Sequence, residues 1–166
     1  MNKRLAVAFT GPSNSGKTTL IIKVANALIA DGKKVSIIKN DPKDKAIFDT
    51  PGKDSYKFCE TGAEVVVTSP NKTTLLSPAH KELEEIIDMF SGFDYLLVEG
   101  LKNLPLPRIS IFRNNIDEDY YPYMNALAVD ESIDMSMHMI PEGIDILDLN
   151  NIDQVINWVT NNAKEV

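Results

Sequence analysis

Eight residues near the N-terminus have the types and spacing that bind the phosphates of a nucleotide. The segment 11–18 reads Gly-Pro-Ser-Asn-Ser-Gly-Lys-Thr and matches G-x-x-x-x-G-K-[ST] at every fixed position. In this motif backbone N–H groups surround phosphate oxygens, the lysine neutralises the β- and γ-phosphates, and the last hydroxyl binds Mg²⁺. The sequence therefore predicts a site for a purine nucleoside triphosphate with Mg²⁺, contributed by Gly11, Ser13, Asn14, Ser15, Gly16, Lys17, Thr18 and Thr19.

Two acidic residues follow apolar runs and are candidate partners of the metal. Glu99 ends the run 95–98, and open parallel sheets bind their ligands at such strand ends. We expect Glu99 to hold a Mg²⁺-bound water or to orient the attacking water, and Asp41, after the run 35–38, to approach the same metal. The predicted catalytic residues are thus Lys17, Asp41 and Glu99. The alternatives are a cap or salt-bridge role for Glu99 and an Asp-Pro turn at Asp41.

The elements that must position these residues alternate between strands and helices. Short apolar or β-branched runs predict strands at 5–10, 35–38, 65–68, 95–98, 109–112, 126–129 and 144–147. Helical spacing predicts a helix from Lys17 to Gly32 and others at 81–90 and 152–162, the last capped by Asn150. This order predicts an α/β fold: a doubly wound, mostly parallel sheet of the P-loop NTPase type, with helices on both faces, in one domain over residues 1–166.

Composition excludes several other classes of protein. The chain has 166 residues and a formal net charge of -7, which argues against a sequence-independent grip on nucleic acid. The single cysteine, Cys59, cannot form an internal disulfide, and no apolar run reaches the roughly 18 residues of a membrane span. We therefore expect a cytoplasmic protein that binds neither nucleic acid nor membrane.

Further polar residues are candidates for a second anion site. Lys53 and Asp54 belong to Pro-Gly-Lys-Asp-Ser at 51–55, at the start of an expected helix, whereas Lys102 and Arg113 follow or end strands on the ligand side. The alternatives are a helix cap for Asp54 and solvated side chains for the three cations. Asp130 follows the strand 126–129, where its carboxylate could pair with N1 and N2 of guanine or simply end the strand in a turn.

Taken in order, these motifs resemble those of the MobB family, the molybdopterin-guanine dinucleotide biosynthesis protein B. The resemblance covers nearly the whole chain. It is carried by the loop at 11–18, Ile-Ile-Lys at 37–39 before Asp41, Pro-Gly-Lys-Asp-Ser at 51–55, Gly-Ala at 62–63, Leu-Val-Glu-Gly-Leu-Lys at 97–102 and Ile-Phe-Arg at 111–113. The chain departs from the family at 40–43, where Asn-Asp-Pro-Lys replaces a turn that commonly carries histidines.

The resemblance implies a homodimeric, GTP-binding accessory protein with weak GTPase activity. Its partner would be the molybdenum cofactor guanylyltransferase, which joins GMP to molybdopterin, and proteins that load molybdoenzymes are further candidates. It implies phosphate and Mg²⁺ binding by Lys17 and Thr18, and a second site, facing the molybdopterin cofactor or a partner, formed by Lys53, Asp54, Lys102 and Arg113. The chain lacks the Asn-Lys-x-Asp sequence that reads guanine, which leaves Asp130 as the candidate.

Two other functions are compatible with the same loop. A small-molecule kinase or ATPase would need an acceptor pocket and normally a basic lid, and no arginine-rich segment is present. A nucleotide-binding adaptor without catalysis would need neither feature. Because no arginine finger is evident in the loop, we expect the isolated protein to hydrolyse its nucleotide slowly.

Overall fold

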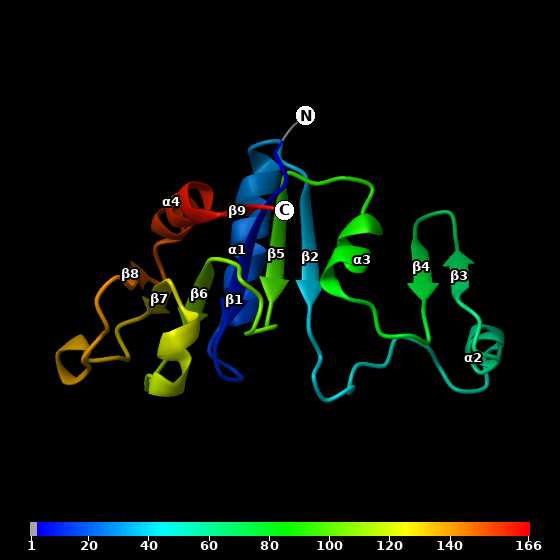
Figure 1. The fold of residues 1–166 in the computed structure, drawn as a ribbon, viewed down its shortest axis with the longest axis horizontal. Coiled ribbons are helices and arrows are strands. Elements are labelled where there is room, and N and C mark those ends of the chain that lie inside the picture. The colour runs from blue at the N-terminus through cyan, green and yellow to red at the C-terminus, as the bar shows by residue number, and fades with distance from the viewer. Residues whose placement is uncertain (1–2) are drawn as a thin grey trace. The chain divides into compact units, whose positions relative to one another are not determined.

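The computed structural model describes residues 3–166, which form two compact units (Figure 1). We name residues 3–40 and 92–166 the sheet unit, and Asp41–Ser91 the hairpin unit. The candidate phosphate loop and Glu99 both belong to the sheet unit. That the whole chain is one domain stays a prediction.

The sheet unit is built on a seven-stranded sheet. Its main strands run in the order β2 (Val35–Lys39), β5 (Tyr95–Glu99), β1 (Leu5–Thr10), β6 (Arg108–Ile111), β7 (Ala126–Val129) and β8 (Asp145–Asp148), all parallel. The short β9 (Lys164–Glu165) pairs antiparallel with the start of β1. The register sets Phe9 beside Glu99 and Glu99 beside Lys39, so the carboxyl ends of β1, β5 and β2 lie together.

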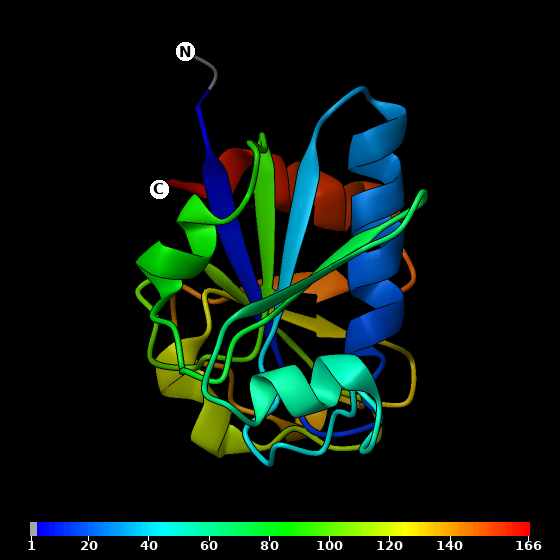
Figure 2. The ribbon, with the colours of Figure 1, turned by 90° about the vertical axis from the view of Figure 1, so that its right-hand side faces the viewer.

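Two helices cover one face of this sheet, as Figure 2 shows for α1. Side chains alternate between the faces of a strand, so Val7, Phe9 and Leu97 point to the same side. There they join one buried cluster with apolar side chains of α1 (Lys17–Ala30) and α4 (Ile152–Asn162). Trp158 of α4 is buried, and its Nε1 donates to Asp145 Oδ2 at 2.7 Å.

The opposite face is covered near β6 and β7 by shorter elements. Phe112, Leu127 and Val129 form a second buried cluster. The 3₁₀ helix Glu118–Tyr123 packs on it through Tyr120, whose ring meets that of Phe112 edge-on at 5.2 Å. The predicted doubly wound, mostly parallel α/β sheet is therefore confirmed.

The hairpin unit contains α2 (Asp54–Cys59), the antiparallel pair β3 (Val65–Thr68) and β4 (Thr73–Leu76), and α3 (Leu83–Asp88). The helix α3 is shorter than the predicted 81–90. The Glu82 N–H donates to Glu85 Oε2 at 2.9 Å, and this bond makes Glu82 the residue before the first turn.

Several boundaries differ from the sequence expectations for local reasons. The cap of α4 is Asn151, whose Oδ1 accepts from the Gln154 N–H at 3.1 Å, whereas Asn150 bonds to residues outside the helix. The strand β6 starts at Arg108, one residue before the predicted start. The strand β9 and the 3₁₀ helix Met135–Met137, of two and three residues, are too short to leave a periodic pattern. Within residues 3–166 no helix has the length and apolar character required to cross a membrane.

Candidate functional site

The loop between β1 and α1 has a backbone that tolerates only particular residues. Gly11 has φ 140°, and a Cβ there would lie 2.3 Å from the carbonyl oxygen of Ile111 in β6. Asn14 and Gly16 also adopt positive φ, at 63° and 98°. Glycine at position 11 thus lets the loop lie directly against the neighbouring strand.

The first turn of α1 is arranged to receive an anion. The residue before the helix is Gly16, which supplies no side-chain cap, and the first turn contains no acidic residue. The first N–H groups of a helix have no partner within the helix, and its dipole favours negative charge there. Ser15 Oγ is buried, and in the described part of the chain it has no hydrogen-bond partner. These groups fit a nucleotide phosphate.

Lys17 lies across the loop. Its Nζ donates to the carbonyl oxygens of Gly11 at 2.9 Å and Pro12 at 2.7 Å. Burial lowers the pKa of Lys17, the charge of Glu99 opposes this shift, and the charge of Lys39 adds to it. The amine therefore lies within electrostatic reach of Glu99, at the place where the sequence motif requires a cation for phosphate oxygens.

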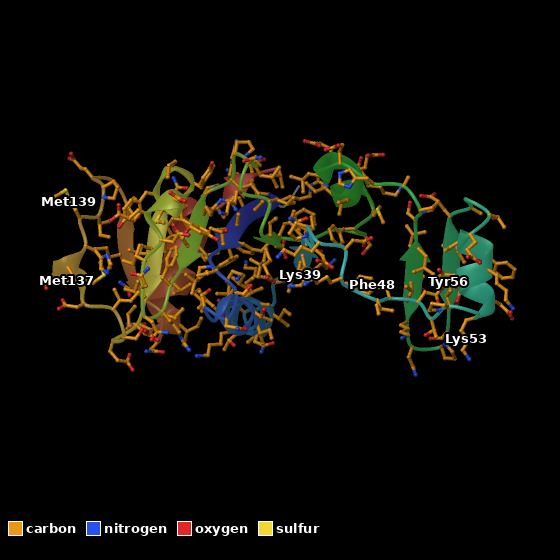
Figure 3. The ribbon with its side chains drawn as sticks, turned by 90° about the horizontal axis from the view of Figure 1, so that it is seen from below. Lys39, Phe48, Lys53, Tyr56, Met137 and Met139 are labelled. Atoms are coloured by element: carbon orange, nitrogen blue, oxygen red, sulfur yellow. The ribbon has the colours of Figure 1, made fainter. Side chains whose placement is uncertain are left out.

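Glu99 ends β5 and is largely enclosed, with 13% of its side chain exposed. Lys39 at the end of β2 (Figure 3) donates to both carboxylate oxygens, at 3.1 and 3.2 Å. Thr18 is exposed in the first turn of α1. A hydroxyl and a carboxylate are the oxygen ligands that Mg²⁺ prefers, so Thr18 and Glu99 fit this ion. The role of Lys39 was missed by the sequence analysis, because only the position of β2 next to β5 makes it a neighbour of Glu99.

Arg113 and Asp130 meet beside the phosphate loop. Arg113 Nε lies 2.9 Å from Asp130 Oδ2, and the guanidinium carbon lies 3.6 Å from where a Cβ on Gly16 would be. Asp130 also accepts hydrogen bonds from the N–H and the hydroxyl of Ser132. These bonds first, and the charge of Arg113 after them, lower the pKa of Asp130. The sheet order explains the contact, since the two residues follow the neighbouring strands β6 and β7.

Lys102 lies in the segment that connects β5 to β6. Its Nζ lies 3.5 Å from the ring centre of Tyr120 and 5.9 Å from that of Tyr123. The same segment forms one wall of an open pocket of about 590 Å³. No acidic residue lines this pocket, whose lining consists of Lys102, Asn103, Leu104, Pro105, Leu106, Pro107, Pro122, Tyr123, Met124, Asn125 and Lys164.

Arg108 is a second residue that the sequence analysis missed. It is 1% exposed, and its guanidinium donates to three backbone carbonyls in the segment that follows Glu99. Burial lowers its pKa. The only signal in the sequence was an arginine next to the apolar run 109–112.

The remaining predicted site residues belong to the hairpin unit. The carboxylate of Asp41 accepts the N–H groups of Lys45 and Ala46, both at 2.7 Å, and so organises its own loop. Lys53 precedes α2, and Asp54, its first residue, lies 3.8 Å from the Lys57 amine rather than capping the helix with its side chain. A role for Asp41, Lys53 and Asp54 in binding nucleotide or metal stays a prediction.

Known proteins share both this sequence and this fold. The family model of molybdopterin guanine dinucleotide synthesis protein B, MobB, matches residues 6–130. The molybdopterin-guanine dinucleotide biosynthesis adapter protein of Escherichia coli (strain K12) is 31% identical over 92% of each chain. The adapter protein of Haemophilus influenzae is 29% identical over 97% of this chain and 91% of its own.

Solved structures give the same fold. The crystal structure of MobB from Bacillus subtilis, 23% identical, covers 96% of this chain and 98% of its own with a TM-score of 0.75. The hydrogenase maturation factor HypB from Archaeoglobus fulgidus, 17% identical, covers 95% of this chain and 87% of its own with a TM-score of 0.53. From the family match and the E. coli relative, the chain belongs to the MobB family.

Proposed function

We propose that this protein is a GTP-binding adapter in the biosynthesis of the molybdopterin-guanine dinucleotide form of the molybdenum cofactor. In this role it assists the enzyme that transfers the guanylyl group to molybdopterin. Membership of the MobB family and the adapter names of its relatives support the pathway. Nucleotide binding is supported mainly by the start of α1, which has no side-chain cap. The loop before it lies directly against β6 at Gly11, and the Lys17 amine lies across this loop on the Gly11 carbonyl.

In this proposal Lys17 exchanges the carbonyls of Gly11 and Pro12 for phosphate oxygens, and Thr18 and Glu99 hold Mg²⁺ directly or through water. The bound ion would neutralise charge on the phosphates. Glu99 would exchange its bond to Lys39 for the metal or its water. Hydrolysis would be an in-line attack of water on the γ-phosphate, with the Lys17 amine stabilising the charge that develops.

Turnover in the isolated protein should be slow. The arginine that lies against the loop, Arg113, is already paired with Asp130. A GTPase without an arginine at the transferred phosphate lacks a contribution that is worth about 10³–10⁵ in rate. We therefore propose a weak GTPase whose nucleotide serves mainly to organise the partner enzyme.

Preference for guanine would come from Asp130. Its lowered pKa keeps the side chain a carboxylate, which would accept hydrogen bonds from the N–H groups at N1 and N2 of guanine. Adenine has no equivalent pair of donors. Asp130 follows a strand beside the loop. Arg113 holds its Oδ2 and Ser132 its Oδ1, so guanine would use the remaining lone pairs of these oxygens. The position and the charge of Asp130 support this assignment.

The pocket beside Lys102 is the proposed place for the pterin cofactor or a loop of the partner enzyme. Its two lysines, Lys102 and Lys164, and the absence of acidic residues from its lining favour an anionic ligand in a chain of net charge -7. A contact of Lys53 and Asp54, in the hairpin unit, with the cofactor or the partner is a separate proposal. This assignment rests on charge and on the family.

A homodimer in the cytoplasm is also proposed. In the hairpin unit, the side chains of Val66, Val67 and Leu75 on β3 and β4 are exposed. β3 and β4 form a sheet of only two strands, which leaves one edge of each without a strand partner among the described residues. An exposed apolar pair of strands is a surface that a second copy could cover.

Reconstitution with the guanylyltransferase tests this function. Purified guanylyltransferase, molybdopterin, GTP and Mg²⁺ would be combined with the wild-type protein, the Lys17→Ala variant, or the Lys33→Ala variant as a matched lysine control beyond α1. We expect the wild type and Lys33→Ala to raise the rate of guanine dinucleotide formation and Lys17→Ala to fail. Equal stimulation by all three proteins would exclude a GTP-dependent adapter. In a separate assay with ATP, transfer of phosphate to a metabolite would point to a kinase.

A further inference from the structure

Arg108 is a buried cation without an acidic partner. It sits at the start of β6 with 1% exposure, and none of the ion pairs among residues 3–166 involves it. A buried charge is costly unless it is paired or hydrogen-bonded. Its hydrogen bonds must therefore be the reason for its presence at this position.

All three side-chain bonds of Arg108 go to the turn that follows Glu99. Nη1 donates to the carbonyl of Gly100 at 2.8 Å, and Nη2 donates to those of Leu101 at 2.9 Å and Leu104 at 3.2 Å. The backbone of this turn is unusual, because Gly100 has φ 90° and Leu101 has φ 48°. A leucine in the left-handed region is strained and persists only where its surroundings hold it.

The base from which Arg108 reaches this turn is fixed by the sheet. Its N–H donates to Asn125 Oδ1 at 3.0 Å, and its carbonyl accepts from the Asn125 N–H at 2.9 Å. The carbonyl of Pro107 accepts from Ala8 N–H in β1 at 2.8 Å. The guanidinium is a rigid fork with five donors, so it can bind three carbonyls at once, which a lysine amine at the end of a flexible stem cannot do with the same precision.

We propose that Arg108 is a positioning residue for the metal side of the nucleotide site. It holds the turn 100–104, and this turn fixes Glu99 on its N-terminal side and Lys102 within it. The Gly100 N–H donates to the carbonyl of Phe9 at 2.9 Å, which ties the same turn to the strand that leads into the phosphate loop. The proposal rests on the proposed function, since it concerns how Glu99 meets Mg²⁺.

The test compares Arg108→Met with wild type in two measurements. The first is the affinity for a fluorescent GTP analogue with Mg²⁺ and with EDTA, which separates binding to the phosphate loop from the gain contributed by the metal. In EDTA, we expect Arg108→Met to bind the analogue with the affinity of wild type. With Mg²⁺, the increase in affinity should be about tenfold smaller than in wild type, which is the effect of one misplaced outer-shell partner of a metal ligand. The second is hydrogen exchange of the backbone amides, which should become faster at 100–106 and stay unchanged in β7.

Two further variants separate positioning from loss of charge or fold. Lys33→Met removes an exposed cation beyond the end of α1, outside the turn 100–104, and should leave both measurements unchanged. Arg108→Lys keeps the charge but cannot bind three carbonyls, and we expect it to lose part of the Mg²⁺ gain. It also serves as the test variant if Arg108→Met does not fold.

Several results would overturn the proposal. These are a Mg²⁺ gain in Arg108→Met equal to that of wild type, an equal loss of affinity with and without Mg²⁺, or faster exchange throughout the sheet. If wild type itself shows no GTP binding, the proposed function fails, and hydrogen exchange alone decides on Arg108. Faster exchange confined to 100–106 then supports the positioning role, and unchanged exchange refutes it.

Discussion

Replacing Gly11 by alanine should distort the phosphate loop, and the structure indicates how much. The new methyl carbon would lie 2.3 Å from the Ile111 carbonyl oxygen, whereas such contacts are normally about 3.3 Å or longer. The loop would have to move by about 1 Å, because that oxygen belongs to the backbone of a central strand. At φ 140° an alanine also costs about 1–3 kcal/mol in backbone strain.

Together with overpacking of about 1–3 kcal/mol, the free energy of unfolding should fall by about 3 kcal/mol. For a chain of this length this lowers the melting temperature by about 6–12 °C. Affinity for GTP should fall at the same time, because displacing a binding group by 1 Å is enough to cost about 10²-fold in well-oriented sites. Differential scanning calorimetry and a nucleotide titration measure the two effects.

Gly32→Ala is the matched control. Gly32 has φ 75° beyond the end of α1, and nothing lies within 4 Å of a Cβ there. It should cost only about 1 kcal/mol, or about 2–4 °C, and leave GTP binding intact. If Gly11→Ala has the melting temperature of Gly32→Ala and binds GTP as well as wild type does, the loop does not depend on glycine at position 11.

Four further predictions concern base choice, stability and assembly. Asp130→Asn should remove the preference for GTP over ATP in competition titrations, whereas Asp134→Asn, in a similar serine-bonded turn without an arginine, should keep it. Because the pKa of Asp130 is lowered in the folded protein, its carboxylate stabilises the fold above pH about 3.9, and this stabilisation is lost as the pH falls through the folded-state pKa. In urea titrations at several pH values, the Asp130→Asn protein should lack this contribution to the decrease in unfolding free energy. Trp158→Phe removes the bond to Asp145 and should lower the unfolding free energy by about 1–3 kcal/mol without changing GTP affinity, and equal melting temperatures would contradict this. Val66→Glu should convert the proposed dimer to a monomer in light scattering, and an unchanged mass would place the interface elsewhere.

The sequence predicted the elements whose side-chain pattern is local. The strand 5–10, the helix starting at Lys17 and the strand 126–129 agree with the structure, because burial on one or both faces leaves a clear period in the apolar residues. The backbone of the loop at 11–18 was predictable for a related reason. Gly11 and Gly16 adopt positive φ, and the whole motif lies within eight consecutive residues.

Contacts that depend on strand order were beyond the sequence alone. Lys39 meets Glu99 only because β5 lies next to β2 in the sheet, although 60 residues separate the pair in the chain. Arg108 appeared to lie just before a strand, and nothing local indicated that its side chain turns to residues 100–104. Methionines alternate at 135, 137 and 139 of the sequence. Met137 and Met139 are exposed in the loop between β7 and β8 (Figure 3), a position that this alternation did not reveal.

We propose above all that the protein binds GTP in preference to ATP, with the phosphates held by the loop at 11–18. Calorimetric titration of the wild-type protein with each nucleotide in Mg²⁺, with Lys17→Ala as the control, tests it most directly. We expect heat from GTP binding, a weaker response to ATP, and loss of both in Lys17→Ala. Equal or tighter binding of ATP, or GTP binding that survives in Lys17→Ala, would contradict it.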